Sequence, residues 1–100
     1  MRIVVLFNLK PGVDPADYEA WVRDTDYPGT RALPSVEGFT TYRARGTLGG
    51  DAAPYAYIET IDIVGLDAFM ADVQTDAVQQ LAARFREFAE DPQFIMAEPV

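Results

Sequence analysis

Two residue types that carry much of protein chemistry are absent from this sequence. There is no cysteine and no histidine among its 100 residues. The first absence excludes disulfides and thiol chemistry, and the second removes the commonest general base and the commonest metal ligand. Ser35 is the only serine, and it cannot form an ordinary catalytic triad without histidine.

Basic residues are scarce as well. The chain has 8 lysines and arginines against 16 acidic residues, and its net charge is −8. Residues 1–50 hold six acids and six bases, whereas residues 51–100 hold ten acids and two bases. An acidic surface repels phosphate backbones and anionic membranes. We therefore expect no nucleic-acid partner and interpret the acidic half as a solvated surface.

Long apolar runs are also missing. The longest is Ile3 to Phe7, far shorter than the roughly 18 residues that would span a membrane. It is also too short for the apolar region of a signal peptide, and no small-residue cleavage site follows it. These features predict a cytoplasmic protein without a membrane partner.

No pattern for a cofactor or a metal is present. Gly46, Gly49 and Gly50 fall in a predicted hairpin turn and do not form a phosphate-binding loop. Metal binding would need carboxylates alone, and the acidic residues are scattered without a ligand pattern. We expect neither a cofactor nor a metal site.

The apolar periodicity predicts a single domain over residues 1–100. Asp14 can cap a first helix that starts at Pro15, and Pro28 is expected to stop that helix. Thr75 can cap a long helix that Asp91-Pro92 ends. The predicted strands are 2–9, 37–47, 53–63 and 93–97, and a short helix is predicted at 65–73.

This order of elements predicts an α+β fold of the ferredoxin-like βαββαβ type, with an antiparallel sheet and the helices on one face. The uncovered face should be polar, but the first strand is apolar on both sides. Tyr55, Tyr57 and Glu59 share one face of the third strand and are interpreted as a dimer seam. We therefore predict a homodimer that packs sheet against sheet.

The whole chain resembles the dimeric α/β-barrel superfamily, which includes EthD-like proteins and small cofactor-free monooxygenases. The resemblance rests on topology, length and the stretch Leu33-Pro34-Ser35-Val36-Glu37-Gly38-Phe39. Within that group the chain is most similar to the REDY-like family typified by HapK of prodigiosin-type pathways, on Trp21, Asp26-Tyr27-Pro28, Leu33-Pro34 and Phe39.

Many relatives place a histidine where this chain has Tyr27, so the chemistry of those relatives does not carry over. A phenol is a poor base at neutral pH unless its pKa is strongly lowered. Asp26, Tyr27 and Arg31 nevertheless form a polar cluster beside an expected cleft. Either they contact a ligand there, with catalysis a further option, or Asp26 and Tyr27 close the helix end while Arg31 pairs with Asp26.

Four more residues are candidate contacts for a ligand. The amide of Asn8 could steady an oxyanion or simply satisfy a strand end. Trp21 is either core or cavity wall. Tyr42 and Arg43 fall on opposite faces of a strand, and Arg43 would bind an anionic ligand or pair with Glu59.

Two functions remain open at this point, besides a purely structural dimer, and whether the protein is an enzyme is not decided. The first is binding of a small aromatic, polyketide-like or pyrrole-like intermediate, as an accessory protein of a biosynthetic pathway. The alternative is a cofactor-independent monooxygenase or isomerase, in which Asn8, Tyr27 or Arg43 stabilises charge. Both predict a pocket between the first helix, the long helix and the sheet, walled by Trp21 and Tyr27.

Overall fold

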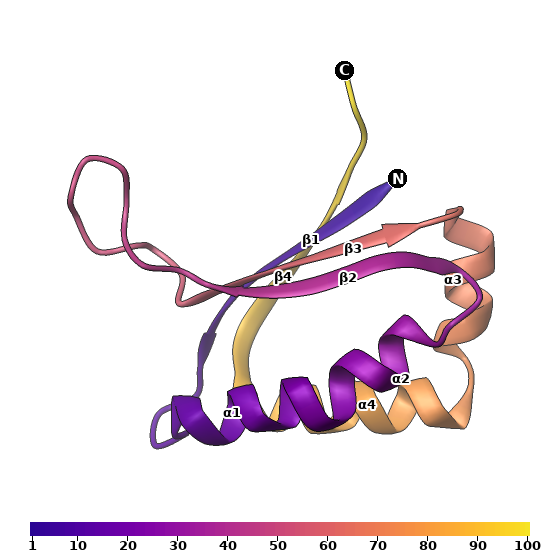
Figure 1. Ribbon diagram of the computed structural model, residues 1–100, viewed down its shortest axis with the longest axis horizontal. Helices are drawn as coiled ribbons and strands as arrows, with labels where there is room; N and C mark the ends of the chain where they lie inside the picture. Colours follow the sequence, from indigo (N-terminus) through magenta and orange to yellow (C-terminus); the bar gives the residue numbers. More distant parts are fainter.

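The protein forms a four-stranded antiparallel sheet with its helices on one face (Figure 1). The computed structural model describes residues 1–100. The strands lie in the order β2-β3-β1-β4. Their bounds are β1 Arg2–Leu9, β2 Val36–Arg43, β3 Tyr57–Ile63 and β4 Ala89–Ala97. The predicted ferredoxin-like α+β fold is confirmed.

Two long helical segments lie beneath the sheet, and a shorter helix stands at one end (Figure 1). The first segment consists of α1 Pro15–Trp21, the π-helix η1 Val22–Asp26 and α2 Tyr27–Arg31. The second is α4 Asp76–Phe88, and the shorter helix is α3 Leu66–Val73. Both predicted caps are present: the Asp14 carboxylate accepts from the backbone N–H of Ala16 at 2.9 Å, and the Thr75 hydroxyl accepts from that of Val78.

The prediction that Pro28 ends the first helix is wrong. The helical path continues to Arg31, because Pro28 lies in the first turn of α2, directly after the π-helical turn. Within that turn the backbone N–H of Tyr27 donates to the carbonyl of Val22, five residues earlier. A first-turn proline does not need a backbone N–H, and the wider turn leaves room for its ring.

Strands β2 and β3, which form a hairpin, are shorter than the sequence predicts. Strand β2 ends at Arg43 and β3 begins at Tyr57, so residues 44–56 form a long loop that projects from the sheet (Figure 1). Gly46 and Gly50 have φ angles of +142° and +97° in this loop, which residues with a side chain rarely adopt.

The last strand is longer than predicted and starts immediately after α4, at Ala89. The pairing of β1 with β4 shifts register between Leu6 and Asn8, and Asp91 there has a φ angle of +43°. This irregularity is a β-bulge. Because β4 is an edge strand, it also tolerates Pro92, which has no N–H for a ladder.

The core lies between the helices and one face of the sheet. From β1, Ile3, Val5 and Phe7 are buried there, and the Phe7 ring contacts the rings of Tyr18 and Phe85. The opposite face of the sheet carries an apolar set of half-buried and exposed side chains: Val4, Leu6, Ile58, Tyr42 and Ile95.

The interpretation of Tyr55, Tyr57 and Glu59 as a dimer seam is wrong. Tyr57 and Glu59 point toward the helices and are buried, so they do not belong to a seam on the outer face of the sheet. Tyr55 precedes the strand.

No helix combines the length and the apolar character that crossing a bilayer requires.

Candidate functional site

A cleft of about 480 Å³ lies between the helices and the helix-facing side of the sheet. Of the 17 residues that line it, 14 are hydrophobic, and the three polar ones are Asp26, Thr30 and Glu59. Its apolar walls come from α3, α4, β1, β2, β3 and β4. This combination of an apolar lining with a few convergent polar groups is typical of small-molecule sites.

Glu59 projects into this cleft from the middle of β3 and is only 4% exposed. Its one side-chain hydrogen bond comes from the Thr41 hydroxyl to Oε1, at 3.5 Å. Burial raises the pKa of the Glu59 carboxyl to about 8, with a further contribution from the negative charge of Asp26. Near pH 7 this carboxyl is therefore mostly protonated and can donate a proton.

Asp26 reaches the same cleft from the end of the π-helix and is 6% exposed. The Thr30 hydroxyl donates to its Oδ1 at 2.9 Å. Burial raises the pKa of the Asp26 carboxyl to about 6, although the Thr30 hydrogen bond opposes the shift. Asp26 is thus mostly ionised near pH 7, and the two carboxyls take different protonation states, as in acid–base pairs of enzymes.

Neither carboxyl has a basic partner. None of the ion pairs in the protein includes Asp26 or Glu59, and one oxygen of each carboxyl makes no hydrogen bond. Neither oxygen is among the fully buried side-chain atoms that lack a partner, which are the Tyr18 hydroxyl and Ser35 Oγ. Asp26 and Glu59 both line the cleft, so each open oxygen is available to a ligand donor or a water there.

Tyr18, from α1, adds a third polar group behind the carboxyls. Its side chain is fully buried and its hydroxyl makes no hydrogen bond of ordinary geometry. Burial and the charges of Glu59 and Asp26 raise the pKa of this phenol, so it stays protonated. The hydroxyl lies close enough to Glu59 to lower the pKa of that carboxyl somewhat.

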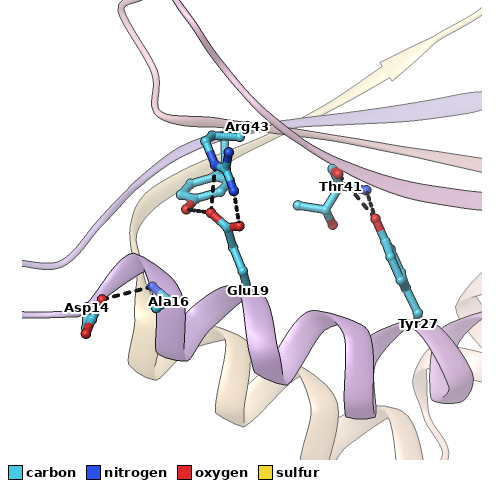
Figure 2. Close-up of polar contacts among 7 residues, drawn as sticks. Asp14, Ala16, Glu19, Tyr27, Thr41 and Arg43 are labelled. Atoms are coloured by element: carbon cyan, nitrogen blue, oxygen red, sulfur yellow. Dashed lines mark hydrogen bonds and ion pairs between the residues drawn. The ribbon is translucent and has the colours of Figure 1, made fainter.

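A smaller pocket of about 270 Å³ lies between the first helical segment and strands β2 and β3. Figure 2 shows its main contact, in which Glu19 meets the guanidinium of Arg43. Arg43 Nε donates to Glu19 Oε2 at 2.9 Å, and the Tyr57 hydroxyl donates to the same oxygen at 2.7 Å. Arg43 and then Tyr57 lower the pKa of Glu19 to about 2. Thr41 lies between the two pockets, because it lines this one and contacts Glu59 in the cleft.

The whole chain matches one family of known proteins. The family model described as REDY-like protein HapK matches residues 1–100. The chain belongs to the REDY-like HapK family. HapK from Hahella chejuensis is 30% identical, with a TM-score of 0.77 over 100% of this chain and 95% of that one. The predicted resemblance is confirmed.

Two more distant structures share the fold of this REDY-like chain. One is SnoaB from Streptomyces nogalater, a cofactor-independent oxygenase: identity is 17%, the TM-score is 0.74, and 99% of this chain and 93% of that one are covered. The other is a dimeric ferredoxin-like protein of unknown function from Thermobifida fusca, with 21% identity, a TM-score of 0.70 and coverage of 94% and 85%. A search of curated protein sequences finds no match.

Only one member of the polar cluster predicted for this REDY-like chain lies in the cleft, and it is Asp26. The Tyr27 hydroxyl accepts from the backbone N–H of Thr41 at 3.0 Å and donates to its carbonyl at 3.2 Å (Figure 2). Arg31 donates to the carbonyl of Phe39 and stacks 3.8 Å from the centre of the Tyr27 ring. The alternative in which Arg31 pairs with Asp26 is therefore wrong.

The remaining predicted residues lie outside the cleft. Trp21 packs against Phe88 and borders a separate shallow hollow beside α4. The side-chain oxygen of Asn8 accepts from the backbone N–H of Ala56 at 2.9 Å, which satisfies a strand end. Tyr42 is exposed on the outer face of the sheet, and Arg43 pairs with Glu19 instead of Glu59. The cleft lies between helices and sheet as expected, but neither Trp21 nor Tyr27 walls it.

Sequence reasoning missed Glu59 as a site residue, although a signal was present. Tyr57, Glu59, Ile61 and Ile63 alternate along β3 and are all buried. A single carboxyl among apolar residues of one strand face indicates a buried acid, because Glu is almost never buried without a reason.

No group of three or more potential ligands is placed to hold a metal ion.

Proposed function

We propose that the cleft binds a mainly apolar small molecule and that Asp26 and Glu59 transfer protons to and from it without a cofactor. The observation that carries this proposal is the pair of buried carboxyls without cationic partners in an otherwise apolar cleft. Burying such groups destabilises a fold. Their presence at the wall of a ligand-sized cavity supports a role in chemistry.

The reaction class that fits is proton removal from carbon next to a carbonyl group. The ionised Asp26 takes the proton from the C–H bond, and the electron pair of that bond moves toward the carbonyl oxygen. Glu59 donates its proton, or a hydrogen bond, to this oxygen as negative charge develops there. The resulting enol can isomerise or react further. The cofactor-independent oxygenase SnoaB has the same fold, which supports the class without indicating a substrate.

Binding without chemistry is the second candidate. The observation that favours it is the lining itself, because 14 of 17 residues are hydrophobic and the cavity is large enough for a small ligand. Under this alternative, the protein holds an intermediate of a biosynthetic pathway and the carboxyls only orient it. Replacing the two carboxyls would then change the affinity for the ligand, and no catalysed reaction would be lost.

Solvent deuterium exchange distinguishes the two candidates. The bicyclic ketones 2-tetralone and 2-indanone are incubated in D₂O near neutral pD, and loss of their α-protons is followed by NMR. We expect the protein to accelerate exchange, and Asp26→Asn and Glu59→Gln each to reduce that acceleration by about a hundredfold. Glu87→Gln, which changes an exposed carboxylate outside the cleft lining, is the control. Binding of the ketones without accelerated exchange would favour the second candidate.

The proposed assembly is a homodimer in which the outer faces of two sheets pack together. That face carries Val4, Leu6, Ile58, Tyr42 and Ile95. An apolar sheet face of this kind is normally covered, and a self-complementary surface favours two-fold symmetry. The similar fold of a Thermobifida fusca protein described as dimeric supports this arrangement.

A further inference from the structure

We infer that the cleft selects ligands that carry a basic nitrogen, bound as a cation between the carboxyls of Asp26 and Glu59. This inference rests on the binding part of the proposed function, namely that the cleft holds a small molecule, and not on proton donation by Glu59, which a bound cation would ionise. It adds the chemical class of the ligand: an apolar, ring-sized body with one amine or imine nitrogen.

The first reason is the set of charges around the cleft. The first helical segment contributes Asp26 and Thr30, β3 contributes Glu59, and the linings from α3, α4, β1, β2 and β4 are apolar. The nearby hydroxyls of Tyr18 and Thr41 carry no charge. No lysine or arginine lines the cleft, so an anionic ligand would meet only like charge.

Arg31 of α2 and Arg43 of β2 are held elsewhere. Arg31 donates two hydrogen bonds to the carbonyl of Phe39 and covers the Tyr27 ring. Arg43 is paired with Glu19 in the separate smaller pocket. Neither supplies a positive charge to the two carboxyls, so a cationic ligand would meet no competing cation from these side chains.

The second reason is hydrogen bonding. One oxygen of Asp26 and one of Glu59 make no hydrogen bond to the protein. An ammonium or iminium group carries N–H donors that can satisfy both oxygens with charge-assisted hydrogen bonds. A hydrocarbon or an ether of equal size satisfies neither, and a carboxylate supplies no donor.

The third reason concerns proton linkage. Near pH 7 Glu59 is mostly protonated because its pKa is raised to about 8. A cation bound beside it favours the ionised form, so binding should release the Glu59 proton to the solvent. The affinity for a cation should then increase with pH until the nitrogen itself loses its charge.

Three naphthalene probes test the inference, since they share one apolar body: 2-(aminomethyl)naphthalene, 2-(hydroxymethyl)naphthalene and 2-naphthoate. Affinities are measured at pH 7 by fluorescence and calorimetry. We expect the amine to bind at least about tenfold more tightly than the alcohol, and naphthoate to bind most weakly. Calorimetry in buffers of different ionisation enthalpy should detect proton release with the amine only.

Glu59→Gln and Asp26→Asn are the variants, and Glu87→Gln is the control. Each cleft variant should reduce the preference for the amine by about fivefold or more, while the affinity for the alcohol stays within about twofold. Glu59→Gln should also abolish proton release. These near-isosteric changes remove ionisation and replace one carboxyl oxygen with an amide NH₂ group, and circular dichroism verifies that the variants fold.

The outcomes separate this inference from the proposed function. Equal binding of the amine and the alcohol, or tightest binding of naphthoate, would overturn the cation preference and leave a small-molecule cleft. A preference for the amine that survives both carboxyl variants would also overturn it. Absence of binding by all three probes would count against the inference and the proposed function together.

Discussion

Glu59 occupies a position where a charged carboxylate is unfavourable. It is surrounded by the core, Asp26 adds like charge, and the Thr41 hydroxyl is its only side-chain hydrogen-bond donor. The pKa of this group is therefore raised above its ordinary value of 4.5 to about 8. Protonation, and not pairing with a cation, allows the carboxyl to stay buried.

This shift makes the stability of the fold depend on pH. Between pH 4.5 and about 8 the folded chain keeps the Glu59 proton that the unfolded chain has lost, so the contribution to stability is complete below pH 4.5 and is lost as pH rises through 8. We expect the free energy of unfolding to fall by roughly 3 kcal/mol from this group between pH 5 and pH 8. Urea unfolding of the protein and of Glu59→Gln across this range measures the difference.

The variant provides the matched comparison. Glu59→Gln should gain stability relative to the unmodified chain as pH rises, because glutamine is never charged. Glu87→Gln is the control for loss of a carboxylate at an exposed position. A constant difference between the chain and Glu59→Gln across the range would show that Glu59 titrates normally.

The π-helical turn places Asp26 in the cleft. It lies between α1 and α2 and ends at Asp26, four residues before the Thr30 hydroxyl that bonds its carboxylate. Such turns often occur at functional sites. They also allow a helix to continue through Pro28, which a regular α-helix accommodates poorly.

Deletion of Thr25, an exposed residue of this turn, should convert the segment to a regular α-helix. Pro28 would then lie within a continuous helix, and the free energy of unfolding should fall by about 3 kcal/mol. Replacing Pro28 with Ala in the deletion variant should recover most of that loss. Thermal unfolding of the single and double variants measures the effect, and equal stability of the two would contradict this explanation of the π turn.

Tyr27 anchors the helical segment to edge strand β2. Its hydroxyl makes two hydrogen bonds to the backbone of Thr41, which favours a structural role over the predicted donation to a ligand. Tyr27→Phe should lower the free energy of unfolding by about 1–2 kcal/mol and leave the affinity for the naphthalene amine unchanged. A loss of affinity without a loss of stability would restore the earlier interpretation.

Some elements could be predicted from local sequence and others could not. Strand β1 and the start of α1 depend on an apolar run and on the Asp14 cap, which are both local signals. The continuation past Pro28 depends on a π turn that no simple periodicity encodes. The alternation along β3 separates one face with Tyr57, Ile61 and Ile63 from another with Thr60 and Asp62. Local sequence does not show that the first face packs against the helices instead of a partner chain, which is what buries Glu59.

At the scale of the whole molecule, the apolar outer face of the sheet favours association of two chains, and the acidic surface opposes it. The net charge of −8 favours solubility, while the exposed Tyr42 and Ile95 favour association. Burial of the sheet face should prevail, because the acidic excess belongs to residues 51–100 and most of it lies outside that face.

Sedimentation equilibrium should therefore give twice the 11.1 kDa mass of one chain at micromolar concentration. Ile95→Lys, which places a charge on the proposed interface, should shift the protein toward the monomer. Ala71→Lys, at an exposed position on α3 outside the cleft lining and the sheet, is the comparison for added charge. A monomer for the unmodified chain would contradict the proposed dimer.

The central claim is that a carboxyl in the cleft holds a proton near neutral pH, and a carbon NMR titration of side-chain carboxyls tests it most directly. The protein is labelled with ¹³C at the glutamate Cδ atoms, and the Glu59→Gln spectrum assigns the Glu59 signal. We predict that Glu59 titrates with a pKa of about 8, well above the acidic range of ordinary glutamates. Titration of Glu59 below about pH 5 would contradict the claim and remove the basis for acid–base chemistry in the cleft.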